Sequence, residues 1–247
     1  FIVWRRAFSS AEVAAITSEF DDLMTELRGG RPFTGQSGEQ QAPFVELRPS
    51  RARLAVVDRI YKTVEELLGP DFIWAGSEGN ITAGDHEWHP DRPGDDEEIT
   101  YVRLKTMLYL DETTRESGAL RVIPGSHRMP LHSEIEPEKH HQRGDRVDPF
   151  GLPGEDVPCF PVESQPGDLI FFNQSLWHSV FGGWVGRRFI GLKYAPAPKT
   201  DKQIASLRHY TRRRSIFEPH DSFAKSDDPR IRLMVDSLPE LGRKRVP

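Results

Sequence analysis

Apolar residues recur at helical spacing in two stretches near the N-terminus. The pattern predicts a helix over about 10–28, with Ser9 and Glu12 forming a capping box at its start. A second helix is predicted over about 51–68, and Gly69 ends it. The apolar faces consist of Val13, Ile16, Phe20 and Leu23 in the first helix and of Leu54, Val57, Ile60, Val64 and Leu67 in the second.

Beyond residue 70 the helical spacing gives way to short apolar runs separated by turn residues. Such runs are typical of strands in a barrel or a sandwich. The stretches expected to be strands are 1–4, 72–74, 101–110, 119–123, 168–172 and 188–194. Residues 29–43 and 128–160 are polar and predicted to be surface segments, and helical spacing returns in 201–247. The order of helices, strands and helices predicts an α+β fold with a mainly β, antiparallel core.

The composition limits the kind of protein without identifying it. The formal net charge is -5, with Lys+Arg 33 and Asp+Glu 38, which gives no electrostatic reason to expect nucleic acid as a partner. No apolar stretch is long enough to cross a bilayer, and the first residues lack the basic start of a signal peptide. Cys159 is the single cysteine, so no intramolecular disulfide is possible, which fits a reducing compartment.

The length of 247 residues suits one domain of the all-β barrel size, or at most two small domains. We expect a single domain over 1–247, with a core at about 1–198 and a C-terminal helical extension at 199–247. The sequence predicts a cytoplasmic protein that acts as a monomer or homodimer, without a nucleic-acid or membrane partner.

The most informative motif is the string Trp88-His89-Pro90-Asp91. His89 and Asp91 are two residues apart, and side chains at i and i+2 of an extended strand point to the same face. An imidazole and a carboxylate can therefore converge on one metal ion. A His-x-Asp pair with a distant second His is the sequence form of the 2-His-1-carboxylate facial triad of non-haem iron(II) sites. By itself the pair occurs by chance in many proteins.

A second motif supplies candidates for the remaining ligand and for a carboxylate-binding residue. The turn Pro166-Gly167 introduces an apolar strand, and His178 stands just beyond the end of that strand. Arg187 and Arg188 follow at the start of the next predicted strand. A guanidinium can bind a carboxylate through two parallel hydrogen bonds, which a lysine cannot match. An arginine one strand beyond the distal His is where the far carboxylate of 2-oxoglutarate would need its partner.

Taken together, these motifs resemble the phytanoyl-CoA dioxygenase family of iron(II)- and 2-oxoglutarate-dependent oxygenases. The matching segments are WHPD at 88–91, TMLYLDETTRESGALRVIPGSH at 106–127, PGDLIFFNQSLWHS at 166–179 and RRFIGLKY at 187–194, and the likeness covers about 1–198. It implies a double-stranded β-helix, or jelly-roll, core. It also implies that His89, Asp91 and His178 bind iron(II), and that a small organic molecule is hydroxylated while 2-oxoglutarate and O2 become succinate and CO2.

The resemblance favours Arg187 as the residue that binds the side carboxylate of 2-oxoglutarate, because the family places one residue between that arginine and the small or apolar positions of the strand. The loop after His178 is slightly shorter than is usual in the family, so Arg188 is kept as the alternative. Alternation puts the two arginines on opposite faces of the strand. Related halogenases replace the carboxylate ligand by a small residue, so the presence of Asp91 favours hydroxylation over halogenation.

Lys105 is a further candidate for binding 2-oxoglutarate. It lies within the predicted strand 101–110 and shares a face with Met107 and Tyr109. A buried lysine needs a partner, and a carboxylate of 2-oxoglutarate or of the substrate would serve. The alternative is that Lys105 lies at the solvent-exposed edge of the strand.

The roles of the remaining candidates stay open at this point. His86 and His127 can line the pocket or serve the structure, and His132, His140 and His141 are expected at the surface. Trp88, Trp177 and Trp184 flank the proposed site, and each either forms a wall of the pocket or packs in the core. Cys159 has no evident base or ligand partner and is expected to be inert.

The insertion at 128–160 is expected to be a mobile lid over the substrate mouth. Its many prolines, glycines and charges leave little apolar surface to anchor it, and long connections in compact domains commonly have a function. The alternative is a rigid insertion packed on the barrel.

Two other functions remain open. One is a catalytically inactive jelly-roll binding protein, against which the intact ligand set argues. The other is an iron oxygenase that does not use 2-oxoglutarate, which would leave the arginine after the distal His without a purpose.

Overall fold

The computed structural model describes residues 1–135, 152–208 and 215–244. The helices are α1 (Ser10–Leu27), α2 (Pro49–Ala52), α3 (Asp58–Leu68), α4 (Asp96–Thr100), α5 (Leu131–Ile135), α6 (Asp201–Arg208), α7 (Asp221–Ala224), α8 (Pro229–Val235) and α9 (Leu238–Arg243), with short 3-10 turns η1 (Val45–Leu47), η2 (Arg53–Val56) and η4 (Gly154–Asp156). The strands are β1 (Ile2–Trp4), β2 (Glu39–Gln41), β3 (Phe72–Thr82), β4 (His86–His89), β5 (Leu104–Tyr109), β6 (Leu120–Val122), β7 (Phe160–Val162), β8 (Leu169–Asn173), β9 (His178–Val180) and β10 (Arg187–Pro196). None of the described helices is long and apolar enough to span a membrane.

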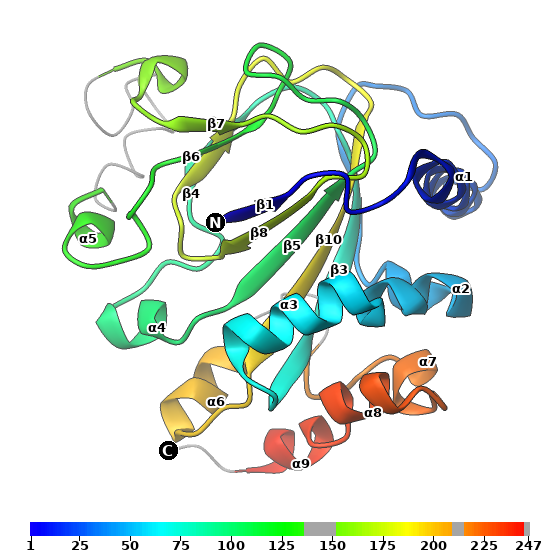
Figure 1. The fold of residues 1–247 in the computed structure, drawn as a ribbon, viewed down its shortest axis with the longest axis vertical. Coiled ribbons are helices and arrows are strands. Elements are labelled where there is room, and N and C mark those ends of the chain that lie inside the picture. The colour runs from blue at the N-terminus through cyan, green and yellow to red at the C-terminus, as the bar shows by residue number, and fades with distance from the viewer. Residues whose placement is uncertain (136–151, 209–214, 245–247) are drawn as a thin grey trace. The chain divides into compact units, whose positions relative to one another are not determined.

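The strands form two sheets (Figure 1). The larger sheet has the order β1-β8-β5-β10-β3-β2, and the smaller sheet has the order β4-β9-β6-β7. The pairs β1–β8, β4–β9, β6–β9 and β6–β7 are antiparallel. From β3 to β10 the chain moves repeatedly between the two sheets, which is the topology of a jelly roll. With the helices before and after the strands, this is the predicted α+β fold.

The chain forms two compact units. The first comprises residues 1–40, 80–100 and 107–190, and the second comprises residues 41–79, 101–106 and 191–247. The expected single domain over 1–247 stays a prediction.

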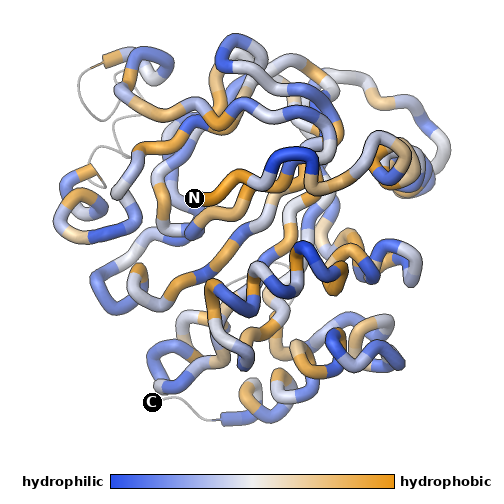
Figure 2. Tube along the Cα trace, in the orientation of Figure 1, coloured by the Kyte–Doolittle hydropathy of each residue, from blue (hydrophilic) through white to orange (hydrophobic). Residues whose placement is uncertain are grey.

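An apolar core in the first unit joins strands of both sheets. The cluster comprises Met107, Tyr109, Leu120, Val122, Val162, Ile170, Phe172 and Leu176. These strand segments are mostly apolar in Figure 2. Because β5 and β8 contribute from the larger sheet and β6 and β7 from the smaller one, their apolar faces point toward each other. The face of β5 that carries Met107 and Tyr109 is therefore an interior face.

The first helix confirms the prediction for 10–28, including its cap. The hydroxyl of Ser9 accepts the backbone N–H of Glu12 at 3.3 Å, and the carboxylate of Glu12 accepts the backbone N–H of Ser9 at 2.7 Å. Two N–H groups that an uncapped helix would leave without partners are thereby satisfied.

Removal of this cap is expected to destabilise the protein modestly. The substitution Ser9→Ala should lower the free energy of unfolding by about 1 kcal/mol, because one first-turn N–H loses its acceptor. Urea denaturation followed by circular dichroism measures the change, and Ser10→Ala is the matched control because Ser10 is exposed at the first helical position. Equal losses in both variants would contradict the capping role.

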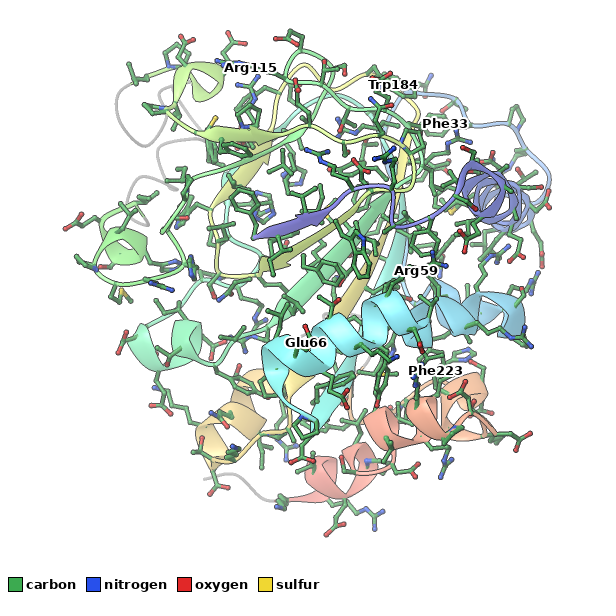
Figure 3. All side chains as sticks on the ribbon, viewed as in Figure 1. Phe33, Arg59, Glu66, Arg115, Trp184 and Phe223 are labelled. Carbon is green, nitrogen blue, oxygen red and sulfur yellow. The ribbon has the colours of Figure 1, made fainter. Side chains whose placement is uncertain are left out.

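An aromatic cluster forms part of the core of the second unit. The ring centroid of Trp74 lies 5.2 Å from that of Tyr194 and 5.1 Å from that of Phe223, which is labelled in Figure 3. Phe72 lies 5.8 Å from Tyr194 and 5.0 Å from Tyr61. The C-terminal helices α6 to α9 confirm the helical spacing predicted for 201–247, although residues 209–214 and 245–247 lie outside the described chain.

The prediction of one continuous helix over 51–68 is wrong. The chain forms α2, η2 and α3, with extended backbone at Val57 (φ -60°, ψ 136°). Side chains from distant segments donate hydrogen bonds to the backbone carbonyls just before Val57. Tyr194 donates to the carbonyl of Ala55 at 3.0 Å, and Arg230 donates to that of Val56 at 2.9 Å. These tertiary bonds replace bonds from helical N–H groups, so the helix begins again at Asp58.

The short strands β2 and β7, and β9 as a strand of its own, were not predicted, and β3 is longer than the predicted 72–74. A strand of three residues has too few positions to display a period of two. Almost every residue of β3 is buried, so the strand shows no alternation of buried and exposed positions that a pattern search could detect.

Candidate metal centre

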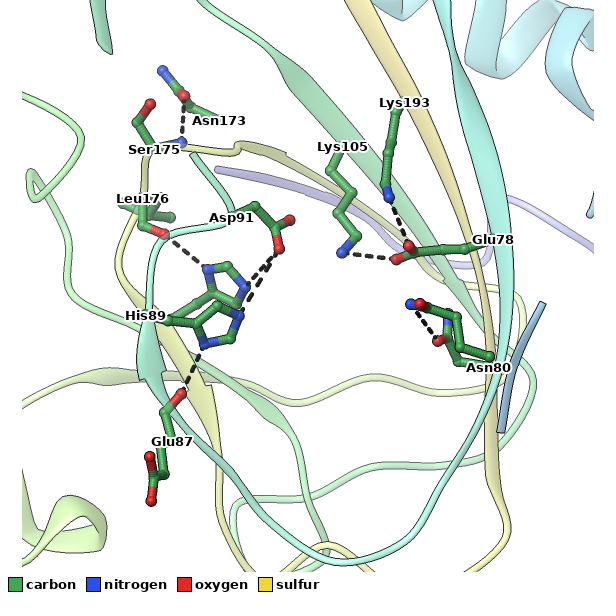
Figure 4. A network of polar contacts seen from close by, with 12 residues as sticks. Glu78, Asn80, Glu87, His89, Asp91, Lys105, Asn173, Ser175, Leu176 and Lys193 are labelled. Atoms are coloured by element: carbon green, nitrogen blue, oxygen red, sulfur yellow. Dashed lines mark hydrogen bonds and ion pairs between the residues drawn. The ribbon is translucent and has the colours of Figure 1, made fainter. Parts of the chain in front are cut away.

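Two neighbouring strands of the smaller sheet bring the three predicted ligands together. In the antiparallel pair β4–β9, His89 stands directly opposite His178. Asp91 follows the end of β4, and its Oδ1 lies 3.9 Å from Nε2 of each histidine (Figure 4). The three ligand atoms all lie within 4.8 Å of one another. Residues far apart in the sequence therefore form one cluster.

Backbone carbonyls fix the tautomer of both histidines. Nδ1 of His89 lies 2.8 Å from the carbonyl oxygen of Glu87, and Nδ1 of His178 lies 2.8 Å from that of Leu176. A carbonyl oxygen can only accept, so each Nδ1 carries the proton and each Nε2 presents a lone pair. Proteins orient metal-binding imidazoles in this way.

The chemistry of these three residues fits an iron(II) ion. Burial and the neighbouring His178 lower the pKa of His89 to about 3, so the ring is uncharged at neutral pH. Two atoms that bind one ion at about 2.1 Å in neighbouring positions of a facial arrangement are about 3 Å apart. The two 3.9 Å separations would therefore shorten by about 1 Å when an ion binds. Two nitrogens and one carboxylate are the donors of a facial triad, which leaves the other coordination positions open.

The tryptophans that precede His89 and His178 pack in the core. Trp88 and Trp177 are fully buried in an apolar cluster with Ile123, Ile135 and Val157. Strand alternation turns each tryptophan away from the face that carries the adjacent histidine. Their packing thus holds the ends of β4 and β9 in place. Trp184 differs, because it is 43% exposed on the loop after β9 (Figure 3).

The turn Pro-Gly-Ser-His at 124–127 supports the strand that carries His178. The hydroxyl of Ser126 accepts the backbone N–H of Trp177 at 2.9 Å and donates to the carbonyl of Ile123 at 2.7 Å. The turn is thereby tied to the chain one residue before His178. Sequence reasoning singled out the turn without finding this role.

Two further histidines differ in their surroundings: one lies close to the cluster, and the other is half-buried. His86 is exposed on β4, and its ring centroid lies 4.4 Å from that of His89. His127 is half-buried, and burial lowers its pKa. Neither histidine belongs to the group of ligand atoms formed by the triad.

The prediction of a surface position for His132 is wrong. Its side chain is fully buried, with Nδ1 3.0 Å from the carbonyl oxygen of Ser126 and the ring centroid 6.3 Å from that of Trp177. The charged residues around it in the sequence suggested exposure, but the short helix α5 turns His132 inward. His140 and His141 lie outside the described residues.

The insertion at 128–160 is anchored by apolar contacts at both described ends. Ile135 and Val157 are buried in the tryptophan cluster, and the carbonyl of Gly154 accepts the indole N–H of Trp88 at 2.9 Å. The expectation of little apolar anchoring is therefore wrong for these ends. The middle of the insertion, 136–151, lies outside the described residues, so the lid itself stays a prediction.

Arg187 is the buried arginine of the pair. Its side chain is 2% exposed, and one guanidinium nitrogen donates to the carbonyl of Gly118 at 2.6 Å. Burial lowers its pKa. Within the part of the chain that the structure describes, Nε of Arg187 has no hydrogen-bond partner and no carboxylate forms a salt bridge with the side chain. Glycines make room for it, because a Cβ at Gly118 would lie 1.7 Å from a guanidinium nitrogen and one at Gly183 would lie 3.2 Å away.

Arg188 points to a different environment. Its guanidinium pairs with Asp111 at 2.6 Å and with Asp21 at 2.6 Å, and these carboxylates raise its pKa. The side chain is about one quarter exposed. Its donors are therefore engaged by protein carboxylates.

Lys105 lies in the second unit with a protein carboxylate as partner. Its Nζ is 2.9 Å from Oε1 of Glu78, whose Oε2 is 2.6 Å from Nζ of Lys193 (Figure 4). Lys105 is only 7% exposed, so the alternative of a solvent-exposed strand edge is wrong. Sequence reasoning missed Glu78 and Lys193, because nothing in the spacing marks an acid and a base on different strands as partners.

Asn80 is a second buried polar residue that the sequence did not single out. Its Oδ1 accepts the side-chain amide of Gln40 at 3.1 Å, within the first unit. Its own amide nitrogen is buried and lacks a hydrogen-bond partner among the described residues.

The fold and the ligand cluster together define a class of protein. A jelly roll with two histidines and one aspartate converging from paired strands is the architecture of mononuclear non-haem iron oxygenases. The chain belongs to the phytanoyl-CoA dioxygenase (PhyH) family, whose model matches residues 1–181. It is thus a member of the iron- and 2-oxoglutarate-dependent oxygenases, and the predicted family is confirmed.

Curated relatives agree with this family. An ectoine dioxygenase from Sphingopyxis alaskensis is 26% identical over 204 residues, which is 74% of this chain and 67% of the relative. An ectoine dioxygenase from Bordetella parapertussis is 22% identical over 200 residues, which is 72% of this chain and 65% of the relative. The chain therefore spans about two thirds of the length of the relatives it matches.

Solved structures share the fold. HygX from Streptomyces hygroscopicus, with nickel and 2-oxoglutarate bound, superposes with a TM-score of 0.63 at 21% identity. The match covers 81% of this chain and 83% of the HygX chain. The epimerase SnoN from nogalamycin biosynthesis, which is described as non-heme and alpha ketoglutarate dependent, has a TM-score of 0.59 at 19% identity, with coverages of 79% and 78%. The predicted jelly-roll core is confirmed by this likeness.

Proposed function

We propose that this chain hydroxylates a small organic molecule while converting 2-oxoglutarate and O2 to succinate and CO2. The observation that supports this best is the cluster of His89, Asp91 and His178, whose ligand atoms lie within 4.8 Å of one another. Membership of the PhyH family supports the use of iron and 2-oxoglutarate. The presence of a carboxylate at position 91 favours hydroxylation.

The three residues would hold iron(II) through Nε2 of both histidines and the carboxylate of Asp91. The backbone carbonyls of Glu87 and Leu176 keep the proton on each Nδ1, so both rings are oriented before the metal arrives. Bound iron(II) supplies the activation of O2 that couples decarboxylation of 2-oxoglutarate to oxidation of a substrate C–H bond. The protein provides the ligand geometry and places the substrate.

Arg187 is proposed to bind the distal carboxylate of 2-oxoglutarate. It is buried, its Nε lacks a partner among the described residues, and its guanidinium lies against Gly118 and Gly183, where a Cβ would crowd it. A buried guanidinium gains most from a carboxylate that binds two of its N–H groups. Arg188 remains the alternative, although Asp21 and Asp111 engage its donors. Lys105 is kept as an auxiliary carboxylate-binding residue, held by Glu78.

Succinate release tests the proposal directly. The purified chain, loaded with iron(II) and supplied with 2-oxoglutarate and O2, is offered a panel that includes ectoine and other polar small molecules. We expect slow release without a substrate and at least about tenfold faster release with a true substrate, because substrate binding commits the site to turnover. Mass spectrometry of the product should show the addition of one oxygen atom.

Two outcomes would contradict the proposal. Succinate release no faster than that of Asp91→Ala, under conditions in which the wild-type chain binds metal, would favour an inactive binding protein. Oxygen consumption that does not require 2-oxoglutarate would favour an iron oxygenase of another kind.

A further inference from the structure

A cavity of about 100 Å³ lies within the second unit. Trp74, Pro43 and Ile216 contribute apolar wall, and Lys193 is the only lysine or arginine among the described residues that line it. A mostly apolar pocket with a few polar or charged groups is the usual form of a small-molecule site, since the walls bind the body of a ligand and the polar groups fix its orientation. We propose that this cavity binds a small organic acid whose carboxylate pairs with Lys193.

The ammonium of Lys193 is held in place by a carboxylate that it shares. Glu78 accepts Lys193 through Oε2 at 2.6 Å and Lys105 through Oε1 at 2.9 Å. Glu78 belongs to β3, Lys193 to β10 and Lys105 to β5, and β10 lies between the other two strands in the sheet. An ammonium has three N–H donors, and Glu78 takes one from Lys193, so the same group can also donate to a ligand.

Stability does not explain why three charged groups lie here. The side chains of Glu78 and Lys105 are 6% and 9% exposed, so both have lost most of their contact with water. Replacement of buried ion pairs by apolar residues of similar volume is often neutral or stabilising. The arrangement instead serves to fix one lysine at the wall of a cavity, and Lys193 retains 21% exposure.

The other charged residues at the cavity do not favour a cationic ligand. Glu46 is buried, and its carboxylate accepts the indole N–H of Trp74 at 2.8 Å, the backbone N–H of Phe44 at 3.1 Å and the hydroxyl of Ser77. These three donors satisfy its oxygens. Glu218 is exposed, so water screens its charge. Lys193 is therefore the group that selects the charge of the ligand.

Calorimetric titration with benzoate tests the site in the full chain, loaded with nickel(II) and saturated with 2-oxoglutarate. Nickel prevents turnover, and saturation with 2-oxoglutarate occupies the carboxylate site proposed at Arg187. We expect one equivalent of benzoate to bind with a Kd of about 1 mM, and the neutral analogue benzamide to bind at least about tenfold more weakly.

Two variants that should change the affinity for benzoate in opposite directions separate the proposed role of Lys193 from general destabilisation. Lys193→Met should weaken benzoate binding at least about tenfold, because the charge that pairs with the carboxylate is lost. Glu78→Gln should strengthen binding several-fold, because Lys193 no longer shares its charge with a protein carboxylate. Lys199→Met is the matched control, since Lys199 is exposed in the same unit, and its affinity should equal that of the wild type.

The proposal is wrong if neither benzoate nor cyclohexanecarboxylate binds saturably, or if Lys193→Met binds benzoate as tightly as the wild type. Should Glu78→Gln fail to fold by circular dichroism, the comparison of Lys193→Met with Lys199→Met still decides. The titration needs no turnover, so its result is independent of the succinate assay.

Discussion

Replacement of Asp91 by alanine is expected to remove tight metal binding and to lower the rate of succinate release at least about 1,000-fold, which corresponds to about 4 kcal/mol of lost transition-state stabilisation. Asp91 is the single carboxylate of the cluster, and its Oδ1 lies 3.9 Å from both histidine nitrogens. Without it, two neutral imidazoles remain, and the ion loses its only anionic protein ligand. Calorimetric titration with nickel(II) and succinate release with iron(II) measure the two effects.

The control for this experiment is Glu87→Ala. Glu87 orients His89 through its backbone carbonyl, which alanine retains, and its side chain is exposed. Metal affinity and turnover should therefore stay within about threefold of the wild type, since surface substitutions change little. Wild-type metal affinity in Asp91→Ala would remove Asp91 from the ligand set.

The substitution Arg187→Met should raise the KM for 2-oxoglutarate about 100-fold and leave nickel(II) affinity nearly unchanged. The expected size is that of a charge-assisted hydrogen-bonded pair, at about 1.5–3 kcal/mol. Methionine keeps much of the buried volume, so the loss should reflect the guanidinium rather than packing. Initial rates of succinate release at varied 2-oxoglutarate measure KM, and nickel titration measures the metal site.

Arg188→Met decides between the two arginines. Arg188 pairs with Asp111 and Asp21, so its loss should change KM less than about threefold and lower stability slightly. If Arg188→Met raises KM strongly while Arg187→Met does not, the assignment of the two residues is reversed.

The sequence was sufficient for the features that local patterns encode. The capping box of Ser9 and Glu12 predicted where α1 begins, because both partners of the cap lie within one turn. The candidate cluster was also readable, since His89 and Asp91 are only two residues apart and His178 follows a recognisable strand. The opposition of His89 and His178 across two strands was not readable, because register depends on pairing between distant segments.

The errors have one physical cause, which is that tertiary contacts override local composition. Tyr194 and Arg230 take carbonyls that a continuous helix over 51–68 would have used. His132 is buried beside Trp177 although its sequence neighbours are charged. Lys105 could be recognised as a lysine in need of a partner, but the identity of Glu78 required the order of three strands in the sheet.

The place of the ligand pair within the smaller sheet also matters for folding. β4 is an edge strand of that sheet, and its pairing with β9 is irregular between His86 and His89. An ion bound by both His89 and His178 would link β4 to β9 and stabilise the pairing of the edge strand. An unfolded chain cannot present both imidazoles together, so the free energy of metal binding adds to that of folding. The supply of metal would thus set the fraction of the protein in which β4 stays paired with β9, as well as the fraction that is active.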